Sequence, residues 1–368
     1  MPIVSQQGPP PSPGWGTPPP PRALGWGQPP PGGPLPPGQG PQPVYSQYGW
    51  GGPPPAPKPG VIPLRPLGVG DVLEATLATL RRYPAATLAS SAVVVGVVTL
   101  LQLALLWPTV DALTGLPDPS VAADPQEWLD ELARLPWAAL LVGSVLVGLL
   151  SFVLVSSLAG LLAVVVGQAV LGRPLGFADA WRRAGTRVPR LLVTVVLVGL
   201  AVGAVWLGLL GLWLLLALTD PPVGLVVAVV LLSLLVALPL SLFLGVRLAL
   251  ATPAVMLESD AAGPIGPATA VRRSWRLVSG AWWRTFGIVL LGAVIAGALS
   301  QVVAVPLNIV ASALALDPTV AVLAGLVAAG IGQAVALPVS GLVLGLVYVD
   351  RRIRAEQLDM ALAQASAQ

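Results

Sequence analysis

The sequence contains no cysteine and no histidine, and only 10% of its 368 residues are charged. The absence of cysteine excludes disulfides and thiolate metal sites, and the absence of histidine excludes imidazole ligands and imidazole acid–base catalysis. All but one of its nineteen basic residues are arginines, the exception being Lys58. A hydrophobic share of 55% with so few charges lies outside the range of soluble domains, so the sequence predicts an integral membrane protein.

Residues 1–60 differ from the rest because proline and glycine dominate them, with scattered glutamine, tryptophan and tyrosine. Proline runs such as Pro18–Pro21 favour extended polyproline II structure, and no packed core can form from such a segment. The chain does not begin with a basic stretch followed by an apolar one, so we expect no secretory signal. Two interpretations are open: a disordered cytoplasmic tether, or a tail that docks onto a protein partner with a proline-binding groove.

Six apolar runs follow from residue 85 onward, each longer than the roughly 20 helical residues that cross a bilayer core. They predict an all-α membrane domain of six transmembrane helices over residues 61–359, followed by a short cytoplasmic tail at 360–368. The approximate bounds of the runs are 85–107, 137–166, 191–218, 223–248, 286–310 and 320–349.

Along the chain, connections rich in arginine alternate with connections that have one arginine or none. The connections after the second and fourth runs and the segment after the sixth are rich in arginine. The connection after the first run is acidic, with Arg134 as its only base, and those after the third and fifth carry none. Because cytoplasmic connections hold the excess of basic residues, both termini are expected in the cytoplasm. Within the acidic connection, Asp124 and Pro125 predict the start of a short outer helix.

A repeated motif precedes each pair of runs. Its copies begin at Pro66 (PLGVGDVLEATLATLRR), Pro174 (PLGFADAWRRAGTRVPR) and Pro264 (PIGPATAVRRSWRLVSG), and each opens with proline, an aliphatic residue and glycine. Apolar residues then recur at helical spacing, while the arginines fall on other faces. Such segments are too short and too charged to cross a bilayer, but they suit the plane of its interface. We therefore expect three repeats of an interfacial helix followed by a transmembrane hairpin.

The densest charge lies in the third copy, where four arginines and three tryptophans occur within residues 272–284. Tryptophan rings and guanidinium groups at the interface meet lipid headgroups and phosphates, so this cluster favours contact with anionic lipid. The arginines form short clusters between apolar runs rather than one continuous face, which argues against nucleic-acid binding. Candidate contacts with headgroups or a protein partner in these clusters are Arg182, Arg183, Arg272, Arg273, Trp275, Arg276, Trp282, Trp283 and Arg284.

The exit from the last run adds two pairs of opposite charge at i,i+4 spacing. Asp350 pairs with Arg354, and Arg352 pairs with Glu356, on a helix that emerges into the cytoplasm. Two roles are open for these four residues. They either pack against the interfacial helices or form a site for a headgroup or a partner.

No ionisable residue lies deep within a run, whereas intramembrane enzymes and proton-coupled carriers usually hold such groups at that depth. We therefore expect a non-enzymatic protein without cofactor or metal. Polar residues near that depth include Gln301, Asn308 and Gln333. They either form hydrogen bonds between helices or line a substrate path, because Gln301 and Asn308 are seven residues apart on one helical face.

Two segments resemble a known family. Ser274-Trp275-Arg276-Leu277 followed by Gly280 and Trp283-Arg284, and the exit Tyr348–Asp359 (YVDRRIRAEQLD), resemble the bacterial membrane-domain family named for glycerophosphoryl diester phosphodiesterases. The entry PGVIPLRPLGVGDVLEATLATLRRYP after a Pro/Gly-rich tail resembles its high-GC bacterial branch. The resemblance covers roughly residues 61–359 and implies a location in the bacterial cytoplasmic membrane.

In some members of this family the membrane region precedes a soluble phosphodiesterase barrel that uses histidines and metal-binding carboxylates. The present sequence has no histidine and ends about twenty residues after its last run, so we do not expect that activity. Three functions are open. We favour a protein that organises partners or supports envelope homeostasis; the alternatives are a carrier or binder of phospholipid or a small solute, and a membrane subunit for a separate phosphodiesterase.

Overall fold

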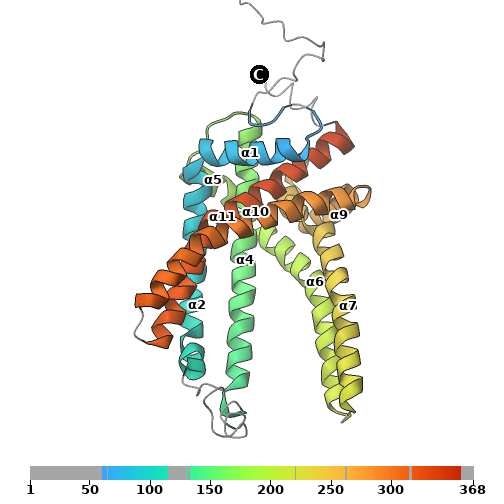
Figure 1. Ribbon diagram of the computed structural model, residues 1–368. Coiled ribbons are helices and arrows are strands. Elements are labelled where there is room, and N and C mark those ends of the chain that lie inside the picture. The colour runs from blue at the N-terminus through green and yellow to red at the C-terminus, as the bar shows by residue number, and fades with distance from the viewer. Residues whose placement is uncertain are drawn as a thin grey trace, which may run out of the picture. The chain divides into compact units, whose positions relative to one another are not determined.

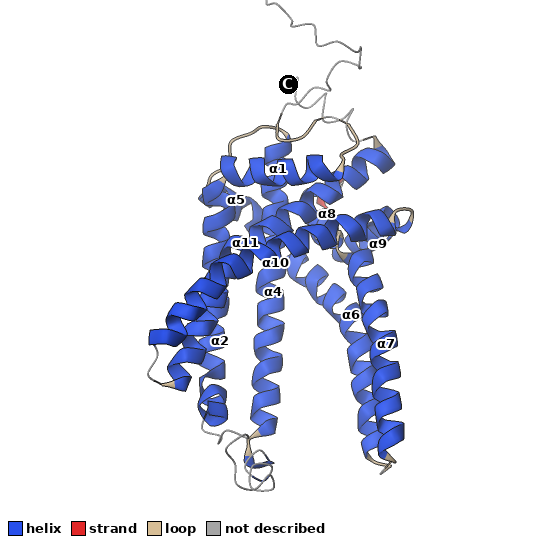
Figure 2. Ribbon diagram, viewed as in Figure 1, coloured by secondary structure: helices blue, strands red, loops and turns tan. Residues whose placement is uncertain are grey.

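The computed structural model describes residues 60–63, 65–114, 130, 133–219, 221–261, 263–314 and 317–357, all within one compact unit, Pro55–Gln368. Helices make up almost all of this part of the chain (Figures 1 and 2). The Pro/Gly-rich tail lies outside the described residues, and so does the helix predicted from Asp124.

Six helices in the described part of the chain are long and apolar enough to cross a membrane, as predicted. A helix suits this environment because it satisfies its backbone hydrogen bonds internally where lipid offers none. The first span combines the π-helical turn η1 (Ala85–Ala89) with α2 (Ser90–Thr114). The other five are formed by α4 (Trp137–Val170), α6 (Val188–Ala217), α7 (Val223–Leu248), α10 (Trp282–Leu314) and α11 (Pro318–Glu356).

One short helix precedes each pair of spans, which confirms the predicted threefold repeat. These helices are α1 (Val69–Arg82), α5 (Phe177–Gly185) and α9 (Pro267–Ser279). Before the third one, α8 (Ala251–Leu257) continues the fourth span, and β1 (Ser259–Asp260) pairs antiparallel with β2 (Gly263–Pro264). We call the end of the membrane helices at which α1, α5 and α9 lie the arginine-rich end.

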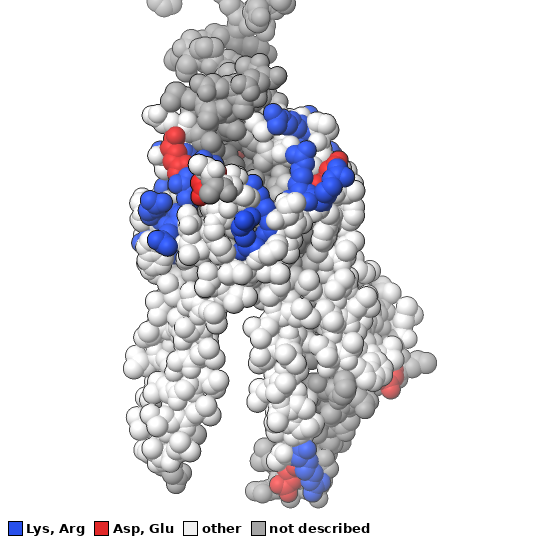
Figure 3. Space-filling model, turned by 180° about the vertical axis from the view of Figure 1, so that it is seen from behind, with Lys and Arg blue, Asp and Glu red and all other residues white. Residues whose placement is uncertain are grey.

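The hydrophobic core sits at the arginine-rich end, where the repeats meet. Leu158 and Leu162 of α4 pack there with Leu342 and Leu346 of α11, and Ile62 joins them from the segment before α1. Farther from this end the helices bury little; only 6% of the most apolar stretch of α4 is buried within the chain. Figure 3 shows most charged side chains in a band at the arginine-rich end, uncharged helices beyond it, and a few charged side chains at the opposite end.

The α6–α7 hairpin diverges from the other spans. It contacts α4, α8, α9 and α10, and its two helices lie side by side toward the turn that connects them. The space-filling view shows open space between this hairpin and the remaining spans (Figure 3). Leu231, Leu232 and Leu235 of α7 are all more than 60% exposed. The hairpin therefore presents apolar side chains to the surrounding lipid rather than to the rest of the chain.

Candidate functional site

The same turn positions the interfacial helix of each repeat. Glycines with extended backbone angles form the N-caps of α1, α5 and α9: Gly68, Gly176 and Gly266. The aliphatic residues before them are all buried: Leu67, Leu175 and Ile265. An apolar anchor thus enters the core, and the glycine then starts a helix along its surface. This explains why the Pro-aliphatic-Gly opening repeats in the sequence.

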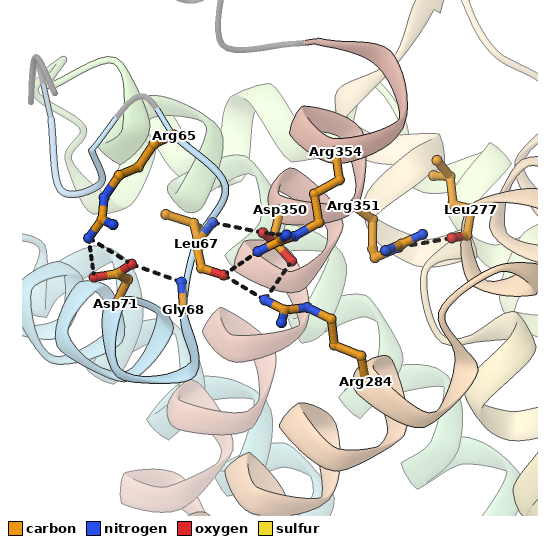
Figure 4. Close-up of polar contacts among 9 residues, drawn as sticks. All are labelled: Arg65, Leu67, Gly68, Asp71, Leu277, Arg284, Asp350, Arg351 and Arg354. Carbon is orange, nitrogen blue, oxygen red and sulfur yellow. Dashed lines mark hydrogen bonds and ion pairs between the residues drawn. The ribbon is translucent and has the colours of Figure 1, made fainter. Parts of the chain in front are cut away.

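The anchor of the first repeat is held by a buried cluster of charge (Figure 4). Asp350, which is fully buried, accepts a hydrogen bond from the Leu67 backbone N–H at 2.9 Å. The Leu67 carbonyl accepts hydrogen bonds from Arg284 at 2.6 Å and from Arg354 at 2.8 Å. Asp350 also pairs with Arg354 Nε at 2.9 Å and with Arg284 at 3.5 Å. This cluster joins the start of α10 and the end of α11 to the segment before α1.

A second ion-pair network surrounds Glu258, which follows α8 and is 8% exposed. Its carboxylate accepts hydrogen bonds from Arg273 Nε at 2.6 Å and from the Tyr348 hydroxyl. Arg352 Nε lies 3.6 Å from the same carboxylate. Glu356 closes a ring by accepting hydrogen bonds from Arg273 Nη2 at 2.7 Å and Arg352 Nε at 3.0 Å. The ring fixes the inner face of α9 to the end of α11.

This ring stabilises the charged form of Arg273. Burial lowers the pKa of its guanidinium group, but the hydrogen bond that Arg273 donates to Glu258 and the charges of Glu258 and Glu356 outweigh burial, so the pKa is raised. Arg273 is thus a partly buried cation held between two carboxylates.

Arg187, between α5 and α6, supports the turn that carries Glu258. Its Nη1 donates to the carbonyls of Met256 at 2.8 Å and Glu258 at 2.9 Å, and its Nη2 donates to Ser259 Oγ at 2.9 Å. These bonds satisfy carbonyls at the C-terminus of α8, where a cation is favoured. Burial and then the nearby charge of Arg190 lower the pKa of Arg187. Arg187 is thus a structural arginine that joins the second and third repeats.

The outer face of α9 carries arginines of a different kind. Arg272 and Arg276, one turn apart, are exposed, and neither forms an ion pair with any described residue. Together with Trp275 and Thr269 they line a shallow cavity of about 420 Å³. Two guanidinium groups and an indole ring around one open cavity can bind a phosphate and the apolar groups beside it.

An aromatic cluster connects α9 with α7 and α10. The guanidinium group of Arg247, on α7, lies 4.7 Å from the ring centroid of Trp275 and 5.0 Å from that of Phe243. Phe243 also lies 5.9 Å from Trp282, which stacks on Phe286 at 5.1 Å with a 10° angle between the rings. The exposed Trp283, Arg272 and Arg276 therefore border a tightly packed patch of rings at the arginine-rich end.

The second repeat presents a smaller version of this surface. Trp181 of α5 donates through Nε1 to Ser90 Oγ at the start of α2 at 3.1 Å, which ties α5 to the first span. Arg182 pairs with Asp179 on its own helix, and both are largely exposed. Arg183 is exposed beside them. Of the two predicted contact residues on α5, Arg183 is the one whose charge is not already paired with a described residue.

The predicted intramembrane contacts lie on α10 and α11. Gln301 and Gln333 have exposed side chains, and Asn308 donates to the Ala304 carbonyl of its own helix at 3.0 Å. A substrate path along these three residues stays a prediction.

The candidate contacts thus fall into two groups that the sequence listed together. The first group forms ion pairs that hold helices together: Arg273, Arg284, Asp350, Arg352, Arg354 and Glu356. The second group faces outward: Arg183, Arg272, Arg276, Trp275 and Trp283. Sequence reasoning missed Glu258, Arg187 and Arg247. Their signal was an ionisable residue at the edge of a long apolar run, a position where an unpaired charge is costly.

Comparisons of the chain with protein-family models, with curated proteins and with solved structures found no match. The resemblance to the phosphodiesterase membrane-domain family therefore stays a prediction.

Proposed function

We propose that this multi-pass membrane protein is a non-enzymatic phospholipid binder whose outer face of α9 holds the phosphate of an anionic phospholipid. The observation that supports this most directly is the cavity between Arg272, Arg276 and Trp275. Each guanidinium group there is exposed and lacks a carboxylate partner among the described residues. A phosphate would supply the missing negative charge and accept hydrogen bonds from both side chains.

The position of the cavity favours a lipid as the source of that phosphate. Trp275 lines it and packs against Phe243, which also contacts Trp282. Tryptophan concentrates at the level of the headgroups. The positive-inside pattern predicts that this end of the spans faces the cytoplasm, where anionic lipids attract clustered arginines by about 1 kcal/mol per residue.

From the sequence we favoured a protein that organises partners through its Pro-rich tail. That tail lies outside the described residues, so the structure provides no contact that bears on this role. A role as a membrane subunit for a separate phosphodiesterase depends on the family resemblance. Lipid binding is supported by contacts within the described chain, so it is the function that the geometry favours.

The test is native mass spectrometry of the protein captured from its membrane in lipid nanodiscs. Wild-type protein is expected to retain a stoichiometric anionic phospholipid, and Arg272→Gln/Arg276→Gln is expected to lose most of it. The matched control is Arg81→Gln/Arg173→Gln, which removes two exposed charges from the same end without touching the cavity or any candidate contact residue. Equal retention by all three proteins would overturn the proposal. Displacement of the lipid by excess inorganic phosphate would show a site for free phosphate instead.

A further inference from the structure

We infer that the recess beneath the aromatic cluster seats one acyl chain of this phospholipid, an inference that rests on the proposed function. The recess has a volume of about 200 Å³ and lies among α4, α10 and α11. Its lining includes Leu158 and Leu162 of α4, Val289 and Ala293 of α10, and Leu344 of α11, together with Ala249 at the end of α7.

The lining selects an apolar occupant. Apart from Ser340, the side chains around the recess are hydrocarbon, and the Ser340 hydroxyl donates to the Leu337 carbonyl of its own helix at 3.0 Å. A buried water needs two to four polar partners, so this recess does not favour water. Covering the apolar lining with hydrocarbon instead of water is favourable by about 25 cal/mol for each Å² of apolar surface removed from water. The bilayer supplies this hydrocarbon in excess.

A continuous face of α10 joins the recess to the proposed headgroup site. Trp282, Phe286, Val289 and Ala293 follow one another at spacings of four, three and four residues, which places them on one side of the helix. Eleven residues of helix span about 16 Å at 1.5 Å per residue. Half of a hydrocarbon core about 30 Å thick is about 15 Å. A chain that begins at the aromatic cluster therefore reaches the recess within one leaflet.

The charge beside the recess favours a phospholipid chain over a second copy of this protein, because the same end of a second copy is itself rich in arginine and would repel this one. The positive charge at the arginine-rich end, from Arg247 to Arg276, complements the phosphate that a phospholipid carries.

The test uses a phosphatidylglycerol that carries a photoactivatable diazirine in the middle of one acyl chain, incorporated into nanodiscs with the full-length protein. Ala293→Trp fills the recess from its exposed side, and Ala298→Trp places the same indole on the exposed surface of α10 outside the recess. We expect the wild type and Ala298→Trp to be labelled on the recess-lining segments of α10 and α11. We expect Ala293→Trp to lose that label.

Native mass spectrometry of the same samples separates this inference from the proposed function. Ala293→Trp is expected to keep the anionic headgroup site, because Arg272 and Arg276 are unchanged, and retained lipid also shows that the variant is folded. Recess labelling that is undiminished in Ala293→Trp, or label spread evenly over all exposed helices, would overturn the acyl-chain seat. If Arg272→Gln/Arg276→Gln retains as much lipid as Ala293→Trp and the wild type, the proposed function is overturned as well.

Discussion

Asp350 accepts a hydrogen bond from the backbone N–H of Leu67, although 283 residues separate the two. The bond joins the end of the last span to the entry of the first repeat. Two arginines complete the contact by donating to the Leu67 carbonyl, so both backbone groups of one buried residue are satisfied by the far end of the chain. The first and third repeats are thereby held together by charge rather than by packing alone.

Replacing Asp350 with alanine should lower the free energy of unfolding by about 3 kcal/mol, because it leaves two arginines beside a buried site without their counter-charge. The value is at the lower end of the range for buried pairs, since Arg284 and Arg354 are 36% and 32% exposed and water screens them. Asp350→Asn should cost less, because the amide oxygen still accepts from the Leu67 N–H. Thermal unfolding in detergent measures each effect.

The matched control for this prediction is Asp179→Ala, which breaks the exposed pair with Arg182. Exposed ion pairs contribute about 0–1 kcal/mol, so this variant should unfold close to the wild-type temperature. A similar loss of stability in both variants would show that the burial of Asp350 carries no special weight.

Close approach of α10 and α11 provides a second prediction. A Cβ atom added at Gly332 would lie 2.5 Å from the Ser300 carbonyl oxygen, whereas one added at Gly297 would meet no atom within 4 Å. Gly332→Ala should therefore destabilise the protein by about 1–3 kcal/mol through overpacking. Gly297→Ala should be neutral or slightly stabilising, because alanine favours helix over glycine by about 1 kcal/mol. Unfolding measurements on the two variants that give equal values would contradict the packing shown here.

The spans and the repeat could be predicted because both depend on local pattern. Long apolar runs need only length, and the pairs Asp350–Arg354 and Arg352–Glu356 need only the geometry of one helix. Several runs proved longer as helices than predicted. For example, α10 begins at Trp282 rather than at 286, since Trp282, Trp283 and Arg284 form its first turn.

The long-range contacts could not be predicted, because they depend on which repeats meet. Nothing near Glu258 in the sequence indicates that Arg273, Tyr348 and Arg352 gather around it. For the same reason, sequence pattern alone could not separate Arg273, which points into the chain, from its neighbour Arg272, which points out. On a helix one residue rotates the side chain by about 100°, and only packing decides which direction is inward.

The orientation in the membrane can be tested without background labelling, because the chain has no cysteine. Ser279 and Thr219 form a matched pair: each is exposed, and each hydroxyl donates to the carbonyl three residues earlier at 2.8 Å. Ser279 is the last residue of α9 at the arginine-rich end, and Thr219 lies between α6 and α7 at the opposite end. In intact cells a membrane-impermeant maleimide should label Thr219→Cys but should label Ser279→Cys only after permeabilisation. The reverse pattern would place both termini outside the cytoplasm.

Retention of anionic lipid should not change between about pH 6 and pH 8. Histidine is the side chain whose ordinary pKa lies in this range, and the chain has none. The residues that we propose bind the phosphate, Arg272 and Arg276, are both arginines. The raised pKa of Arg273 also predicts no change in this range. The stability that its ion pairs contribute is fully present below the pKa of the unfolded chain and is lost only as the pH rises through the pKa of the folded chain.

Native mass spectrometry of nanodiscs prepared across this range measures the effect directly, with Glu258→Gln as the comparison variant. Constant retention in both proteins is expected, since the binding residues are arginines and Glu258 acts only on the inner face of α9. A retention curve with its midpoint inside the range, abolished by Glu258→Gln, would contradict this. It would mean that protonation of a buried carboxylate, transmitted through Arg273, controls the lipid site on the outer face of the same helix.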